Sequence, residues 1–260
     1  MDLELKSKRA LVTGASQGIG AAVAQRLAKE GCDLLLTARN AANLNTIMAK
    51  LTADYGVVVE TLPLDLAEPG SIDTLIAASG DIDILINNAG AIPAGRLADI
   101  AEDQWRQVWE VKLFGYINLT RALYGPMVAR GGGVIINICG ASGERPKAMY
   151  ICGATANTAL MSFSMALGGD SMQDGIRVIA LNPGPVATER LIDLTKASAV
   201  EKLGDGERWQ ELWAPLPEGR PATVEEVADT VAFLASSRSA YTSGTVVTVD
   251  GGYCNRGSLM

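Results

Sequence analysis

Short apolar runs alternate with longer amphipathic segments along almost the whole chain. The apolar runs are continuous rather than interrupted by polar residues, which is typical of strands covered on both faces. Strict alternation of strand and helix favours a doubly wound α/β fold with a mostly parallel sheet of about seven strands. The expected strands are 9–13, 33–37, 57–62, 82–87, 134–138, 176–181 and 245–249. The expected helices are a first one ending near Gly31 and others over about 40–54, 70–79, 103–129, 150–168 and 223–237.

Chain length, composition and net charge limit the kinds of protein that this sequence can encode. The chain has 260 residues, 48% of them hydrophobic, which fits one large core and a single domain over 1–260. The formal net charge is −7, and Lys and Arg form no run, which disfavours a nucleic-acid or anionic-membrane partner. The charged start lacks the apolar part of a signal peptide, and no apolar run reaches the ~18 residues of a membrane span. We therefore expect a soluble cytoplasmic protein.

Histidine and cysteine usage excludes several kinds of site. The chain contains no histidine, which excludes a Ser-His-Asp or Cys-His catalytic site. Its four cysteines, Cys32, Cys139, Cys152 and Cys254, have no metal-binding spacing, so no metal site is expected. We interpret them as reduced thiols of a cytosolic protein.

A glycine-rich loop lies between the first expected strand and the first helix, over residues 13–20, with the sequence TGASQGIG. Glycines let the backbone turn sharply and approach a pyrophosphate closely, and the helix N-terminus supplies free N–H groups. This position between a strand and an amphipathic helix makes the loop a candidate dinucleotide site. The candidate contacts in the loop are Gly14, Ser16, Gln17, Gly18, Ile19 and Gly20.

The GxxxGxG spacing of this loop resembles the TGxxxGIG signature of the short-chain dehydrogenase/reductases. The resemblance continues in NNAG at 87–90, NPG at 182–184 and VDGG at 249–252, in the family's order. It implies a Rossmann-type fold, an NAD(P) cofactor, interconversion of alcohols and carbonyls, and a homodimer or homotetramer through the helices matching 103–129 and 150–168. The further cofactor contacts that it implies are Asn88, Gly90, Pro183, Gly184, Val186 and Thr188.

The end of the second expected strand bears on the choice of cofactor. An acid there would hold the adenine ribose of NAD, but Asp33 opens the strand at the wrong edge of the sheet. The carboxyl end instead carries Ala38 and Arg39, and Arg39 is suited to pair with the 2′-phosphate of NADP. We therefore expect NADP in preference to NAD, the alternative being that Arg39 is an ordinary solvated charge. Asp65 and Leu66 resemble the family's adenine-contacting pair.

The catalytic positions depart from the family pattern of Asn, Ser, Tyr and Lys. Tyr150 matches the general acid/base, whose ordinary pKa near ~10 is lowered in the family by nearby positive charge. Ala154 stands where YxxxK has its lysine, Gly140 replaces the serine, and Lys112 replaces the asparagine. Tyr150 is thus the one member of the set that is retained.

Two interpretations of this altered set stay open. In the first, the Lys112 ammonium enters the space left at Ala154 and lowers the pKa of Tyr150. Ser142 then supplies the lost hydroxyl, and the protein remains an NAD(P)-dependent oxidoreductase, which is the function we expect. In the second, redox chemistry is lost and the protein is a dinucleotide-binding regulator or a non-redox protein. Dehalogenase-like chemistry on this fold is disfavoured, because those relatives lose the glycine-rich loop.

The segment between Pro183 and Pro221 has no clear helical pattern. A long insertion after the carboxyl end of a strand in such a sheet is typically a lid or binding loop, and we place it at about 186–220. Its apolar and aromatic side chains favour an apolar or aromatic small-molecule substrate. They are Leu191, Leu194, Trp209, Leu212 and Trp213.

Overall fold

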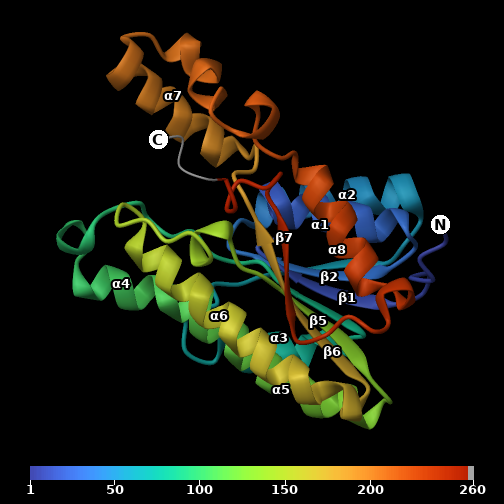
Figure 1. The fold of residues 1–260 in the computed structure, drawn as a ribbon. Coiled ribbons are helices and arrows are strands. Elements are labelled where there is room, and N and C mark those ends of the chain that lie inside the picture. Colours follow the sequence, from blue (N-terminus) through green and yellow to red (C-terminus); the bar gives the residue numbers. More distant parts are fainter. Residues whose placement is uncertain (257–260) are drawn as a thin grey trace.

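The structure, a computed structural model, describes residues 1–256 and contains one seven-stranded sheet (Figure 1). Its strands are β1 Arg9–Thr13, β2 Asp33–Ala38, β3 Val59–Pro63, β4 Ile84–Asn87, β5 Gly133–Ile138, β6 Ile176–Pro183 and β7 Thr245–Val249. They lie in the order β3-β2-β1-β4-β5-β6-β7, and each neighbouring pair is parallel. The strand order reverses between β1 and β4, which is where such sheets bind ligands. The predicted doubly wound α/β fold is confirmed.

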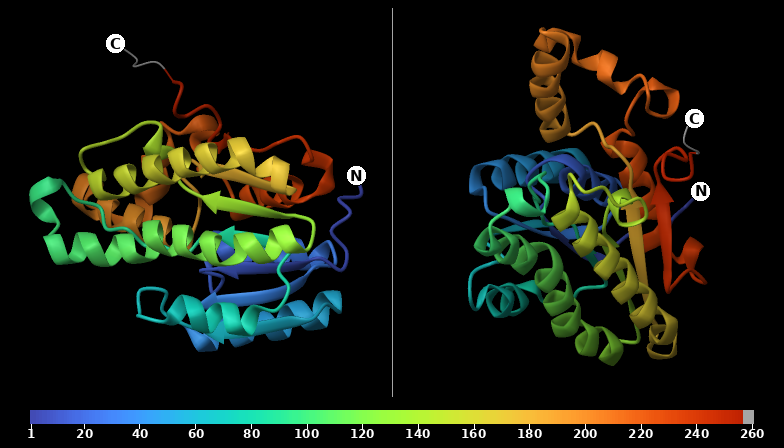
Figure 2. Two further views of the ribbon diagram at one scale, coloured as in Figure 1. Left: turned by 90° about the horizontal axis from the view of Figure 1, so that it is seen from below. Right: turned by 60° about the vertical axis from the view of Figure 1, so that its left-hand side comes forward.

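Helices cover both faces of the sheet. They are α1 Gly18–Lys29, α2 Ala41–Tyr55, α3 Ser71–Ser79, α4 Glu102–Trp109, α5 Gly115–Ala129, α6 Ile151–Asp170, α7 Glu189–Leu203 and α8 Val224–Ala235. Figures 1 and 2 show α1, α2 and α8 over one face and α3, α4, α5 and α6 over the other. Each face has its own buried apolar core, the first including Leu36 and Val231 and the second Leu85 and Leu123. Among residues 1–256, no helix is long and apolar enough to cross a membrane.

The helix expected over 103–129 is interrupted in the middle. A π-helix spans Glu110–Phe114 between α4 and α5. Its backbone hydrogen bonds reach five residues back instead of four, so the helix widens locally. Lys112 and Leu113 are both buried, although neighbouring positions of a regular helix face different directions. The prediction of one continuous helix was wrong here, and the wide turn brings Lys112 to the edge of the sheet.

The segment after β6 forms helices of its own. α7 starts at its N-cap Thr188, whose hydroxyl accepts the N–H of Leu191, and a 3-10 helix follows over Gly206–Trp213. The two pack on each other, and the Trp213 indole N–H donates to the Thr195 hydroxyl of α7 at 3.3 Å. Within the 3-10 helix, the rings of Trp209 and Trp213 lie edge to face with their centroids 4.5 Å apart. Both project beyond the carboxyl end of β6 (Figures 1 and 2).

The sequence of α7 shows no clear helical pattern, because few of its residues form an apolar face. Of its 15 residues only Thr195 and Ala199 are buried, and a helix with so small an apolar face has weak hydrophobic periodicity. The expectation that this segment lacks a helix was therefore wrong.

Candidate functional site

The glycine-rich loop has the geometry that a pyrophosphate requires. Gly14 and Gly18 adopt φ angles of +65° and +56°, which side-chain-bearing residues avoid. A Cβ at Gly20 would overlap the carbonyl of Gly14. The side chain of the N-cap residue Gln17 makes no capping hydrogen bond, so the first N–H groups of α1 are left for an anion. The loop therefore fits the phosphates of a dinucleotide.

Two side chains hold this loop against the end of β4. The Thr13 hydroxyl accepts the N–H groups of Asn88 and Ala89 at 2.9 and 3.0 Å. In return, Asn88 Nδ2 donates to the carbonyls of Thr13 and Gly14 at 3.0 and 3.3 Å. Asn88 therefore holds the glycine-rich loop, the cradle for the pyrophosphate, in place without a ligand.

The predicted adenine end of the site comes together at the ends of β2 and β3. The Arg39 guanidinium lies 3.8 Å from the Asp65 carboxylate, and 75% of the Arg39 side chain is exposed. Asp65 also accepts the N–H of Ala67, and Leu66 is buried. An exposed ion pair of this kind contributes little stability, so Arg39 is free to turn toward a phosphate.

The residues after β6 lie against the same loop. A Cβ at Gly18 would meet the Thr188 side chain at 3.3 Å. A Cβ at Gly184 would lie 2.7 Å from that of Asp250 in the VDGG motif. The backbone of Val186 forms a parallel bridge with Ala222. The fold therefore brings Pro183, Gly184, Val186 and Thr188 to the edge of the sheet that carries the glycine loop.

Lys112 is buried below the NNAG motif. A Cβ at Gly90 would lie 2.8 Å from Lys112 Cδ, so the lysine stem passes directly beneath that glycine. Its Nζ donates to the carbonyls of Ile138 and Cys139 at 2.6 and 3.3 Å and to the Tyr116 hydroxyl at 3.0 Å. Burial lowers the pKa of Lys112 to about 8. All three ammonium protons are engaged at the end of β5.

Tyr150 is the N-cap residue of α6, and its ring lies on Gly153, where a Cβ would overlap the ring. Its backbone pairs with Gly95 in the loop after β4. Burial raises the pKa of Tyr150, and the charge of Arg190 opposes that rise. Within residues 1–256, Lys112 makes its hydrogen bonds to groups other than Tyr150. The proposed effect of Lys112 on Tyr150 therefore stays a prediction.

The Asn157 side chain of α6 occupies the space beside Gly140, at the position where the family pattern has its serine. A Cβ at Gly140 would lie 2.8 Å from Asn157 Nδ2, and that amide donates to the Ser142 hydroxyl at 2.9 Å. The Gly140 N–H donates to Asn182 Oδ1. Sequence reasoning missed Asn157, although its spacing of seven residues from Tyr150 puts both on one helix face. Ser142 is thus oriented by a buried amide.

Comparison with known proteins decides the family. Residues 8–199 match the family model of the short chain dehydrogenases. The chain belongs to the short-chain dehydrogenase/reductase family. It is 34% identical to the 3-oxoacyl-(acyl-carrier-protein) reductase FabG of Escherichia coli, over 96% of this chain and 98% of the relative. It is 31% identical to the uncharacterized oxidoreductase YvrD of Bacillus subtilis, over 97% of this chain and 98% of the relative.

A solved short-chain reductase has nearly the same fold. It is the L-sorbose reductase of Gluconobacter frateurii complexed with NADPH and L-sorbose, with a TM-score of 0.92 and 33% identity over 98% of this chain and 100% of that one. Positions 112, 140 and 154, where the sequence predicts departures from the family pattern, lie within this shared fold. Membership makes this chain one of a family of oxidoreductases.

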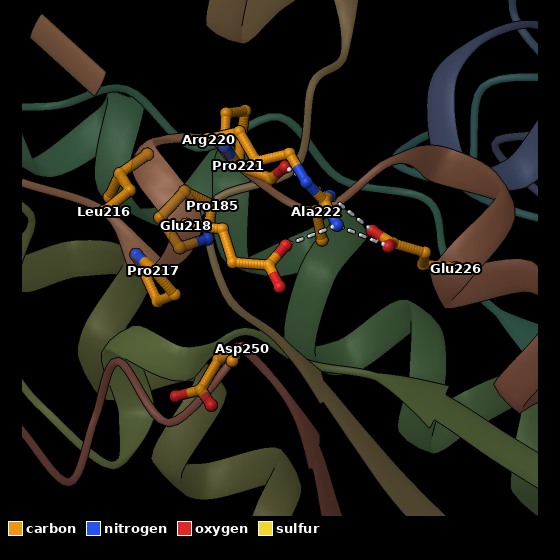
Figure 3. A pocket seen from close by; sticks show the side chains of 10 residues that line it. Pro185, Leu216, Pro217, Glu218, Arg220, Pro221, Ala222, Glu226 and Asp250 are labelled. Carbon is orange, nitrogen blue, oxygen red and sulfur yellow. Dashed lines mark hydrogen bonds and ion pairs between the residues drawn. The ribbon is translucent and has the colours of Figure 1, made fainter. Parts of the chain in front are cut away.

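A pocket at the base of the α7 segment lies next to Gly184 and Val186, since Asp250 and Ala222 line it (Figure 3). Its charged side chains are engaged with one another: Arg220 pairs with Glu226 at 2.9 Å and with Glu218 at 3.0 Å. Asp250 on the opposite wall accepts the N–H groups of Gly252 and Cys254. The pocket joins the start of α8 to the VDGG turn and contains none of the predicted catalytic residues.

Proposed function

We propose that this chain is an NADP(H)-dependent oxidoreductase that interconverts an alcohol and a carbonyl on an apolar or aromatic small molecule. One observation carries the proposal: the glycine cradle follows the carboxyl end of β1 and Tyr150 comes after that of β5, two parallel strands with only β4 between them, so both lie at one edge of the sheet. The similar L-sorbose reductase, described with NADPH, supports the cofactor class. NAD is the alternative cofactor.

The chain's own groups suit each part of NADP. The N-terminus of α1, with Ser16, Gln17 and Ile19, faces the pyrophosphate, and Arg39 pairs with the 2′-phosphate. Asp65 and Leu66 border the adenine. The groups around the nicotinamide half are Asn88, Gly90, Pro183, Gly184, Val186 and Thr188.

When bound, the cofactor supplies or accepts the hydride at the substrate carbon. In reduction, the Tyr150 hydroxyl donates its proton to the substrate oxygen. Burial raises the pKa of this phenol, so it is protonated at neutral pH and ready to donate. Ser142, oriented by Asn157, hydrogen-bonds the same oxygen. Lys112 donates hydrogen bonds to the backbone carbonyls at the end of β5. In the interpretation made from sequence, it also adds positive charge to the site.

Two further features belong to this proposal. The segment of about 186–220 acts as a lid, since α7 and its 3-10 helix project over the edge that carries the cradle. The chain forms a homodimer or homotetramer through the helices over 103–129, which are α4, the π-helix and α5, and over 150–168, which is α6. Large apolar side chains exposed along these helices support that surface: Phe114, Val128 and Met165.

The test is consumption of NADPH with a panel of ketones, ketoses and 3-oxoacyl thioesters, followed by absorbance of the reduced cofactor. We expect consumption with at least one carbonyl. Gln17→Glu is the matched control: Gln17 is exposed, and a carboxylate there favours the helix N-terminus but repels a pyrophosphate. The variant should fold normally and lose NADPH binding.

A second function is favoured by one observation, the absence of the family's lysine at Ala154. In that case the chain is a dinucleotide-binding regulator or non-redox protein on the same fold. Tight NADPH binding without turnover of any carbonyl, or of any alcohol with NADP⁺, would support this second function and contradict the first.

A further inference from the structure

The first turn of α7 carries an arginine that reaches back toward Tyr150. Arg190 follows the N-cap Thr188 by two residues, and its Nη2 donates to the carbonyl oxygen of Ile92 at 2.6 Å. Ile92 belongs to a small apolar cluster with Cys152, and the Tyr150 ring packs against the same cluster. The guanidinium is therefore fixed by a residue of the cluster on which the tyrosine rests.

The cluster on which Tyr150 packs consists of apolar side chains and the Cys152 thiol. α4 presents aromatic and aliphatic side chains to it. The Cys152 thiol stays protonated, because burial raises its pKa. Burial also raises the pKa of Tyr150, and the positive charge that opposes this rise is that of Arg190. Arg190 is thus the cation that the fold presents to the phenol.

The neighbouring cations are engaged elsewhere. Arg96 Nε donates to the Met149 sulfur at 3.1 Å, and Lys147 Nζ donates to the Tyr253 hydroxyl at 2.7 Å. Lys112 has its three protons on two backbone carbonyls and a second phenol. Each of these cations hydrogen-bonds to an uncharged group other than Tyr150.

We propose that Arg190 is a positioning residue that supplies the positive charge missing at Ala154 and stabilises the phenolate of Tyr150. The inference rests on the proposed function. In reduction, the bound cofactor would supply the hydride for the new C–H bond and be left as NADP⁺, while the Tyr150 O–H bond breaks and its proton moves to the substrate oxygen. The phenolate left behind faces the Arg190 guanidinium until a proton from water restores the phenol. Because Arg190 stands at the root of α7, the charge and the proposed lid move together.

The test is a pH titration of Tyr150 by NMR of the protein labelled with ¹³C at tyrosine Cζ, with the Tyr150 signal assigned from Tyr150→Phe. Arg190→Gln should move the titration to higher pH, and Arg190→Lys should restore most of the change. Lys112→Met decides between this inference and the expectation made from sequence that Lys112 lowers the pKa of Tyr150: if Arg190 supplies the charge, the titration stays in place. Ala154→Lys in the Arg190→Gln background should move the titration back, because it rebuilds the family's YxxxK pair.

Turnover provides the second readout. Arg190→Gln should lower NADPH-dependent turnover about 10- to 100-fold and shift its alkaline limb, with Arg190→Lys close to wild type. An unchanged Tyr150 titration in folded Arg190→Gln, or a shift in Lys112→Met instead, would overturn the inference. A shifted titration in a protein that neither binds nor consumes NADPH supports the Arg190–Tyr150 coupling while the proposed function fails.

Discussion

The ammonium nitrogen of Lys112 lies 2.6 Å from the carbonyl oxygen of Ile138, the last residue of β5. The lysine enters from the π-helix, passes under Gly90 and closes the end of the strand. A buried cation in this position binds its proton less tightly than in water. The same contact therefore links the stability of the sheet edge to pH.

We expect the stability of the wild type to rise, relative to Lys112→Met, as the pH increases from about 8 to 10. The pKa of Lys112 is lowered from 10.5 to about 8 by burial. Between these values the folded chain binds fewer protons than the unfolded chain, so raising the pH favours folding. The gain is at most about 3 kcal/mol. Urea unfolding of both proteins across this pH range measures it, and parallel curves would show that Lys112 has an ordinary pKa.

Two adjacent glycines near the end of α6 should respond oppositely to alanine. A Cβ at Gly168 would overlap the backbone of Gly244 and Val178, whereas a Cβ at Gly169 meets nothing within 4 Å. Gly168→Ala should cost more than about 2 kcal/mol, and Gly169→Ala should add about 0.5 kcal/mol through helix propensity. Thermal unfolding of the two variants checks the packing of α6 on β6. Equal effects would contradict that packing.

Arg39 should decide the cofactor preference. We expect NADPH to raise the melting temperature more than NADH at equal concentration, because Arg39 is exposed and pairs only loosely with Asp65. Arg39→Ala should weaken NADPH binding about tenfold and leave NADH binding nearly unchanged. Calorimetric titration measures both. A wild type that prefers NADH would refute the NADP preference.

The segment of 190–216 should exchange its amide hydrogens faster than the rest of the molecule when no ligand is bound. It projects from the sheet and packs mainly on itself. NADPH together with a substrate should slow this exchange as the lid closes. Peptides from 120–129 in α5 serve as the control and should not change. Strong protection in both states would argue against a lid.

Most of the sheet could be predicted from sequence because its central strands are apolar runs, whereas β3 contains Glu60 and Thr61 and starts at Val59 rather than at residue 57. The bounds of β1 and β7 agree with the predicted 9–13 and 245–249, and β4 starts two residues later than expected. The glycine loop could also be predicted from sequence. Glycine is required at position 14 by the positive φ angle and at position 20 by the close approach of the Gly14 carbonyl. The strands and the glycine loop depend mainly on residues that are adjacent in the sequence.

The rest of the candidate site depends on long-range contacts. Arg190 bonds to Ile92, 98 positions earlier, and Asn157 fills the space beside Gly140 from another element. The π-helix that buries Lys112 has no apolar period of its own. Sequence could identify the altered positions, but it could not show which side chains replace the missing ones, because that is decided by the packing of loops.

The turnover of Tyr150→Phe shows whether the Tyr150 hydroxyl is the proton donor of the reaction. With NADPH saturating and a carbonyl substrate identified, the account predicts a loss of about 10²- to 10⁴-fold, since the proton donor is removed while the ring still packs on Gly153. Tyr124→Phe is the control and should leave turnover unchanged, because the Tyr124 hydroxyl donates to Asp174 in the 3-10 helix Ser171–Asp174 that follows α6. NADPH binding should be the same in both variants. Turnover of Tyr150→Phe equal to that of wild type would contradict the account.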